Sequence, residues 1–107
     1  MTNIPGLCGE QKMETEIVET KKGAALGIKI SLGKSPLLIV KAEKGYLCCG
    51  YFNKKTIEKL DDCAAVISGV KSFPEMLKKR VEYATKKARE LGVKKGMLGE
   101  KALDKLI

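Results

Sequence analysis

The clearest pattern in the chain is an alternation of apolar and other residues from Leu26 to Leu32. Such a period of two is typical of a β-strand with one buried face. A polar, β-branched segment at 13–20 precedes it, and apolar segments at 37–43 and 46–51 follow it across short turns that contain Gly and Lys. Because tight turns join antiparallel neighbours, we expect a four-stranded antiparallel meander.

The pattern changes after the fourth predicted strand. Asn53 is a suitable N-cap for a short helix that ends near Asp62. The next segment, 63–67, is continuously apolar, as expected of a strand that is buried on both faces. A strand, a helix and a strand in succession predict a right-handed βαβ crossover, so this strand should run parallel to the strand at 46–51.

A capping box opens the C-terminal third of the chain, where Ser72 precedes Glu75. The apolar residues that follow have the spacing of one helical face: Leu77, Val81, Ala84, Ala88 and Leu91. We therefore expect one lysine-rich helix over 75–91, ended by Gly92. A last short helix is expected from about Gly99.

These elements predict an α/β (α+β-like) domain with a mixed sheet. Its parts are an antiparallel β-meander, a βαβ unit and two C-terminal helices. Within the single domain 1–107 we expect an N-terminal extension at 1–12, a β-rich region at 13–43, and the βαβ unit with the C-terminal helices at 44–107. A chain of 107 residues can bury a core of its own without disulfides or metals.

The composition is that of a folded protein, since 44% of the residues are hydrophobic and 32% are charged. No apolar run approaches the roughly 20 residues of a membrane-spanning helix. The N-terminus also lacks the basic cluster and apolar stretch of a secretory signal. We therefore expect a cytoplasmic protein with no membrane partner. Abundant Lys and Glu with few amides are a thermophile-like feature.

The cysteines Cys8, Cys48, Cys49 and Cys63 occur without a CxxC spacing, and the chain has no histidine. Structural zinc ligands usually come in spaced pairs, so we expect no metal and reduced thiols. Cys49 is the one candidate nucleophile, but it has no histidine to act as its base. A thiol packed in the core is the favoured interpretation. No carboxylate pair or cofactor motif stands out, so enzymatic activity stays open and no cofactor is predicted.

The net charge of +8 is concentrated toward the C-terminus. An interaction or nucleic-acid-binding module that uses the lysine-rich helix at 75–91 is therefore an alternative function, since phosphate contacts add salt-dependent affinity. Glutamates interrupt the lysines, however, and three tyrosines and two phenylalanines are too few and scattered for a base-stacking platform. Nucleic acid is not the expected partner.

Several short segments after Lys41 carry a family resemblance. They are Gly45-Tyr46-Leu47-Cys48-Cys49-Gly50, Gly69-Val70, Tyr83-Ala84, and the run from Leu91 to Leu103 that contains Gly96-Met97-Leu98-Gly99. On these residues the chain resembles the YunC-like family of small bacterial and archaeal proteins, classed as a domain of unknown function. The resemblance implies an α/β fold whose N-terminal β region serves tetramer formation. It implies no known activity.

Self-association is also expected from the residues themselves. The strand from Leu26 to Leu32 has an apolar face, and the predicted helices are few for the length of the meander. An apolar sheet face of this kind needs a cover. Together with the resemblance, this predicts a homo-oligomer, a tetramer as in the family, built through residues 13–43.

A ligand site is predicted where the two parallel strands end. Ligands of open α/β sheets lie beyond the carboxyl ends of parallel strands. Here both strands lead into helix N-termini, whose free N–H groups favour an anion. Lys54 and Lys55 would add positive charge, and Cys49 would lie beside the crevice. Two ordinary strand-to-helix turns are the alternative. The candidate ligand-binding residues, for a small anion such as a phosphate or carboxylate, are Gly50, Asn53, Ser68, Gly69, Lys71 and Ser72.

Overall fold

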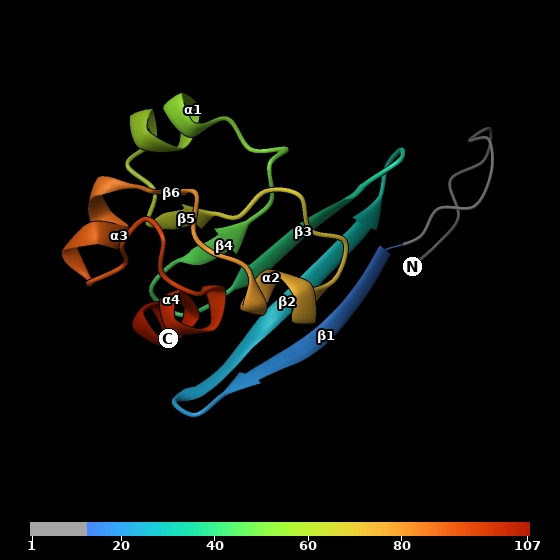
Figure 1. Ribbon diagram of the computed structural model, residues 1–107, viewed down its shortest axis with the longest axis horizontal. Helices are drawn as coiled ribbons and strands as arrows, with labels where there is room; N and C mark the ends of the chain where they lie inside the picture. The colour runs from blue at the N-terminus through green and yellow to red at the C-terminus, as the bar shows by residue number, and fades with distance from the viewer. Residues whose placement is uncertain (1–12) are drawn as a thin grey trace.

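A six-stranded mixed sheet with the strand order β1-β2-β3-β4-β5-β6 forms the centre of the computed structural model (Figure 1). The structure describes residues 13–107, so the predicted extension at 1–12, with Cys8, lies outside the described residues. The strands are β1 (Met13–Thr20), β2 (Gly23–Ser31), β3 (Pro36–Lys41), β4 (Tyr46–Cys48), β5 (Ala64–Val66) and β6 (Tyr83–Ala84). The helices are α1 (Lys54–Lys59), α2 (Phe73–Lys78), α3 (Lys86–Glu90) and α4 (Gly99–Leu106).

The predicted fold class is confirmed. Strands β1 to β4 pair antiparallel in chain order, as a meander does, and β4 pairs parallel with β5 across the crossover helix α1. Helix α1 begins where its cap was expected, because the Asn53 side chain accepts a hydrogen bond from the Thr56 N–H at 3.1 Å. The βαβ unit therefore places the ends of β4 and β5 side by side.

The main core lies between one face of the sheet and helices α2 and α4, which lie in front of the sheet in Figure 1. Leu38, Leu47 and Leu103 are fully buried there. Close packing at this face requires glycine at position 27, since a Cβ there would lie 2.9 Å from the Phe73 ring. Helix α4 confirms the predicted last helix and the start expected at Gly99.

The opposite face of the sheet is covered over only part of its width. Over β4 and β5, a second cluster of Cys48, Ile57, Ala64 and Val66 places helix α1 against the sheet. Over β1–β3 the same face carries large apolar side chains that remain accessible. Met13, Ile17 and Leu26 are 49%, 62% and 42% exposed, and Ile17 pairs directly with Leu26.

The single helix predicted over 75–91 is wrong. Helix α2 ends at Lys78, the chain then extends, and Tyr83–Ala84 pairs antiparallel with β5 before α3 begins. The Glu82 N–H donates to the Val66 carbonyl at 2.8 Å. The free edge of β5 thus offers hydrogen bonds that the apolar spacing along the chain does not reveal.

Thr85 fixes the position where the strand gives way to the next helix. Its buried hydroxyl oxygen accepts hydrogen bonds from the Ala88 N–H, which caps α3, and from the Ala64 N–H at 3.1 Å. The lysines of 75–91 therefore share no continuous helical face. Lys87 and Arg89 also pair with Asp61 and Glu58. The alternative function that depended on a lysine-rich helix loses its structural basis.

Among residues 13–107, no helix is both long enough and apolar enough to cross a membrane.

Candidate functional site

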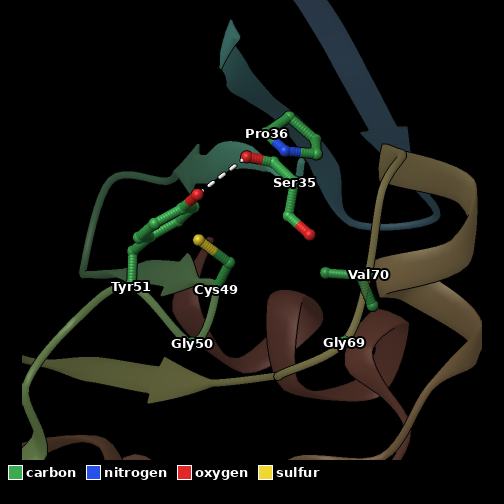
Figure 2. A pocket seen from close by; sticks show the side chains of 7 residues that line it. All are labelled: Ser35, Pro36, Cys49, Gly50, Tyr51, Gly69 and Val70. Atoms are coloured by element: carbon green, nitrogen blue, oxygen red, sulfur yellow. Dashed lines mark hydrogen bonds between the residues drawn. The ribbon is translucent and has the colours of Figure 1, made fainter. Parts of the chain in front are cut away.

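A pocket of about 270 Å³ lies where the end of β4 and the end of β5 meet the start of β3 (Figure 2). Its lining residues are Ser35, Pro36, Cys49, Gly50, Tyr51, Gly69 and Val70. It occupies the edge that the sequence predicted, beyond the carboxyl ends of the two parallel strands. A volume just below the usual range for ligand pockets suits a small metabolite.

Cys49 forms the inner wall of this pocket. Its sulfur points toward the space between Tyr51 and Ser35 (Figure 2), although the residue is only 3% exposed. The Leu38 backbone N–H, on the neighbouring strand, donates to this sulfur at 3.4 Å. This thiol therefore has a backbone hydrogen-bond donor beside it within the pocket wall.

Cys48 has the opposite environment. Adjacent strand residues point to opposite faces, and the Cys48 thiol lies in the cluster beneath α1, where it donates to the Ala65 carbonyl at 3.6 Å. Burial raises the pKa of Cys48 to about 12, with a smaller contribution from Cys49. Cys48 therefore lies on the other face of the sheet, and Cys49 is the thiol that lines the pocket.

Four residues of the lining have backbone N–H groups that are free of hydrogen bonds within the described chain. Within residues 13–107, no hydrogen bond is found from the N–H groups of Gly50, Tyr51, Gly69 or Val70. Gly69 also has φ +72, a left-handed conformation that glycine adopts without strain. Successive free N–H groups in turns of this kind are typical of concave sites for anions.

The charges around the pocket are unequal. The Lys79 ammonium donates to the Gly69 carbonyl at 3.3 Å. The carboxylate of Glu82 is compensated, because it lies 3.1 Å from the Lys54 ammonium and accepts from the Ser68 hydroxyl at 2.9 Å. The hydrogen bonds from Lys54 and Ser68 lower the pKa of Glu82. The lysine beside Gly69 therefore leaves positive charge next to the pocket.

The structure brings only part of the predicted ligand set into the lining. Gly50, Gly69 and Cys49 line the pocket. Asn53 and Ser72 cap α1 and α2, where they accept from the Thr56 and Glu75 N–H groups. Ser68 is bonded to Glu82. Lys71 is exposed and outside the lining, as is Lys55. The positive charge closest to Gly69 belongs to Lys79, which the sequence did not single out.

Four lining residues were not among the six that the sequence named: Ser35, Pro36, Tyr51 and Val70. For Pro36 and Tyr51, the sequence did contain a signal, which is the register of β3 and β4. The short turn between β3 and β4 sets a register in which Ile39 pairs with Cys48. Continuing that register places Pro36 opposite Tyr51, so the start of β3 must lie beside the end of β4. The closeness of Val70 depends on how the loop after β5 bends.

No group of three or more His, Cys, Asp or Glu residues close enough to hold a metal ion occurs in the described part of the chain. Cys48, Cys49 and Cys63 are free thiols. The expectation of a protein without a metal or cofactor stays a prediction.

Comparisons with known proteins agree with the resemblance described above. A family model described as "Domain of unknown function (DUF1805)" matches residues 48–106. The uncharacterized protein YunC of Bacillus subtilis is 31% identical over 84 residues, which cover 75% of this chain and 83% of that protein. The crystal structure of TA1206, a protein of unknown function from Thermoplasma acidophilum, superposes with a TM-score of 0.87 at 32% identity, covering 95% of this chain and all of that one.

Proposed function

The chain belongs to the DUF1805 family, a domain of unknown function, and is related to YunC. Because this membership implies no activity, we propose a function from the site itself. The protein binds a small anionic ligand in the pocket formed by Cys49–Tyr51, Gly69–Val70 and Ser35–Pro36. The observation that carries this proposal is the set of four pocket residues whose backbone N–H groups have no hydrogen-bond partner within the described chain. Unpaired N–H groups gain most from a charged acceptor such as a carboxylate or phosphate.

The lining suits a ligand with a small anionic group and a short apolar part. The N–H groups of Gly50 and Gly69 would face the anionic group, while Pro36, Val70 and the Tyr51 ring supply apolar contacts. The site differs from the original prediction in one respect. The donors are loop N–H groups rather than the helix N-termini, which Asn53 and Ser72 already cap.

Amide chemical shifts provide the most direct test. The ¹⁵N-labelled protein is titrated with inorganic phosphate and, separately, with acetate at millimolar concentrations. We expect saturable shifts at the amides of Gly50, Tyr51, Gly69 and Val70. Shifts confined to exposed lysine-rich segments, or no shifts at all, would contradict the proposal.

A matched pair of variants assigns the shifts to the pocket. Ser35→Phe adds a ring at a lining position, so we expect it to abolish the shifts. Leu32→Phe adds a ring to the same turn at an exposed residue outside the lining, so binding should persist. If both variants bind phosphate like the wild type, the ligand does not lie in this pocket.

For the assembly, we propose a homotetramer built through the sheet face of residues 13–43 that helices leave uncovered. Exposed Ile17 and Leu26 form its centre, beside Ile28 and Ile39, which are half-buried. Burial of such a face is favourable by roughly 25 cal/mol for each Å² of apolar area. The family resemblance points to the same region.

Light scattering at tens of micromolar protein tests the assembly. We expect the wild type to have the mass of a tetramer and Ile17→Lys to form a smaller species. Glu16→Lys is the matched control, since the residue just before Ile17 in β1 is also exposed but points to the opposite face. A monomeric wild type, or equal masses for the wild type and Ile17→Lys, would refute this use of the face.

A further inference from the structure

Within residues 13–107, one side-chain hydrogen bond joins the two parts of the pocket wall that cover Cys49. The Tyr51 hydroxyl, on the loop between β4 and α1, donates to the Ser35 carbonyl in the turn between β2 and β3 at 2.9 Å. Figure 2 shows this bond spanning the space toward which the Cys49 sulfur points. This arrangement explains how Cys49 lines a pocket of about 270 Å³ and is still only 3% exposed.

The two sides of this wall are weakly held by the rest of the protein. Tyr51 is 51% exposed, and the turn at 32–35 lies outside the strands, with Leu32 55% exposed. A Cβ at Gly33 would meet nothing within 4 Å. Moving Tyr51 away from the turn therefore disrupts one hydrogen bond of a side chain that is already half exposed. Segments with few buried contacts are the ones that open locally while the rest of a protein stays folded.

The opposite wall is held more firmly. Val70 belongs to the main core and is 3% exposed. The carbonyl of Gly69 accepts a hydrogen bond from Lys79, which ties this loop to the end of α2. If the pocket opens, the side formed by Tyr51 and Ser35 is the side that moves.

We infer that the hydrogen bond between Tyr51 and Ser35 is a latch, and that small molecules reach the inner pocket beside Cys49 when Tyr51 parts from the turn between β2 and β3. Gating by a loop and an exposed aromatic side chain is a common way to control entry to a site. The latch concerns access alone. It therefore does not depend on whether the ligand is an anion.

The rate at which neutral iodoacetamide alkylates Cys49 measures this opening. In the reaction the Cys49 sulfur bonds to the methylene carbon, the carbon–iodine bond breaks, iodide leaves with the electron pair, and the thiol proton passes to solvent. Peptide mass spectrometry assigns the modification to each cysteine separately. Cys63, half-buried and outside the pocket lining, serves as an internal reference.

Tyr51→Phe removes the hydroxyl and keeps the ring. Because a net hydrogen bond contributes about 0.5–1.5 kcal/mol, we expect Cys49 to react about two- to tenfold faster in this variant. Tyr83→Phe is the matched control, because it removes a tyrosine hydrogen bond of 2.5 Å to Glu58 away from the pocket lining. It should leave the Cys49 rate unchanged.

Low concentrations of urea distinguish local opening from global unfolding. Local opening exposes little surface, so the Cys49 rate should hardly change with urea below the unfolding transition. The latch is overturned if Tyr51→Phe leaves the rate unchanged, if both tyrosine variants accelerate Cys49 and Cys63 alike, if the rate follows global unfolding, or if native Cys49 does not react. Failure of anion binding would instead appear in the amide shifts and leave these rates as they are.

Discussion

Strands β4 and β5 have helices against both faces, whereas β1–β3 are covered on one face only. All three residues of β5 are at most 1% exposed. In β1, by contrast, Val18 is the one residue of eight that is buried. The two regions share one hydrogen-bonded sheet, so backbone pairing does not distinguish them. Side-chain packing does, and it divides the molecule into a firmly packed βαβ unit and a β-arm of strands β1–β3.

This difference gives the two regions separate roles. The βαβ unit has enough buried contacts to hold the rigid wall of the pocket, at Gly69 and Val70. The β-arm contributes its free turn to the movable wall and its uncovered face to the proposed assembly. This division predicts that the same kind of substitution changes the free energy of unfolding by different amounts in the two regions.

The largest expected difference is between two leucines. Leu47, in β4, is fully buried, while Leu26, in β2, is 42% exposed. Leu47→Ala should lower the free energy of unfolding by about 2–5 kcal/mol, because it leaves a cavity in the core. Leu26→Ala should cost less than about 1 kcal/mol in the dissociated protein. Urea unfolding at low protein concentration measures both, and equal costs would break the comparison.

The next test concerns the one covered face of the β-arm. Gly27→Ala places a methyl group against the Phe73 ring, so we expect a loss of about 1–3 kcal/mol from overpacking. Gly33→Ala, in the free turn that follows β2, meets no neighbour within 4 Å. It should leave stability unchanged or raise it slightly, since alanine restricts the unfolded chain. Thermal and urea unfolding of the two variants would show whether α2 really holds the β-arm.

The dependence of stability on alkaline pH tests the packing of Cys48 beneath α1. The folded pKa of Cys48 is raised to about 12 from 9.0. The stability contributed by the protonated thiol is therefore complete below pH 9 and is lost as the pH rises toward the folded pKa. Between pH 8 and pH 10 the wild type should lose about 1.4 kcal/mol more than Cys48→Ala. Urea unfolding under reducing conditions measures this difference, and parallel pH profiles would show that Cys48 is not buried in this way.

The smallest expected effect lies at the rim of the pocket. The folded pKa of Glu82 is lowered from 4.5 by Lys54 and Ser68, so its contribution to stability is present above that pH and is lost on acidification below it. Both partners of the ion pair are 45% exposed, which limits the contribution to less than about 1 kcal/mol. Glu82→Gln should flatten the acid limb of the stability profile by that amount. A loss of several kcal/mol would mean that the rim is as tightly packed as the core.

The sequence alone determined the elements that depend on local patterns. The alternation around β2, the turns of the meander, the Asn53 and Ser72 caps and the start of α4 are all set by residues close to each other in the chain. The run at 63–67 predicted a strand buried on both faces, as β5 is. The carboxyl ends of the parallel strands also located the pocket, because that rule follows from chain order.

Tertiary structure decided the features that depend on distant partners. The segment 79–85 has helical spacing, but the free edge of β5 supplies hydrogen bonds to Glu82 and Thr85, so it extends. Asn53 and Ser72 each bind one N–H group at the start of their own helix and lie outside the pocket lining, where the free N–H groups are those of the loops at Gly50 and Gly69. Tyr51 reaches Ser35 across the sheet because β3 lies beside β4. Such contacts join residues far apart in the chain, so no local pattern records them.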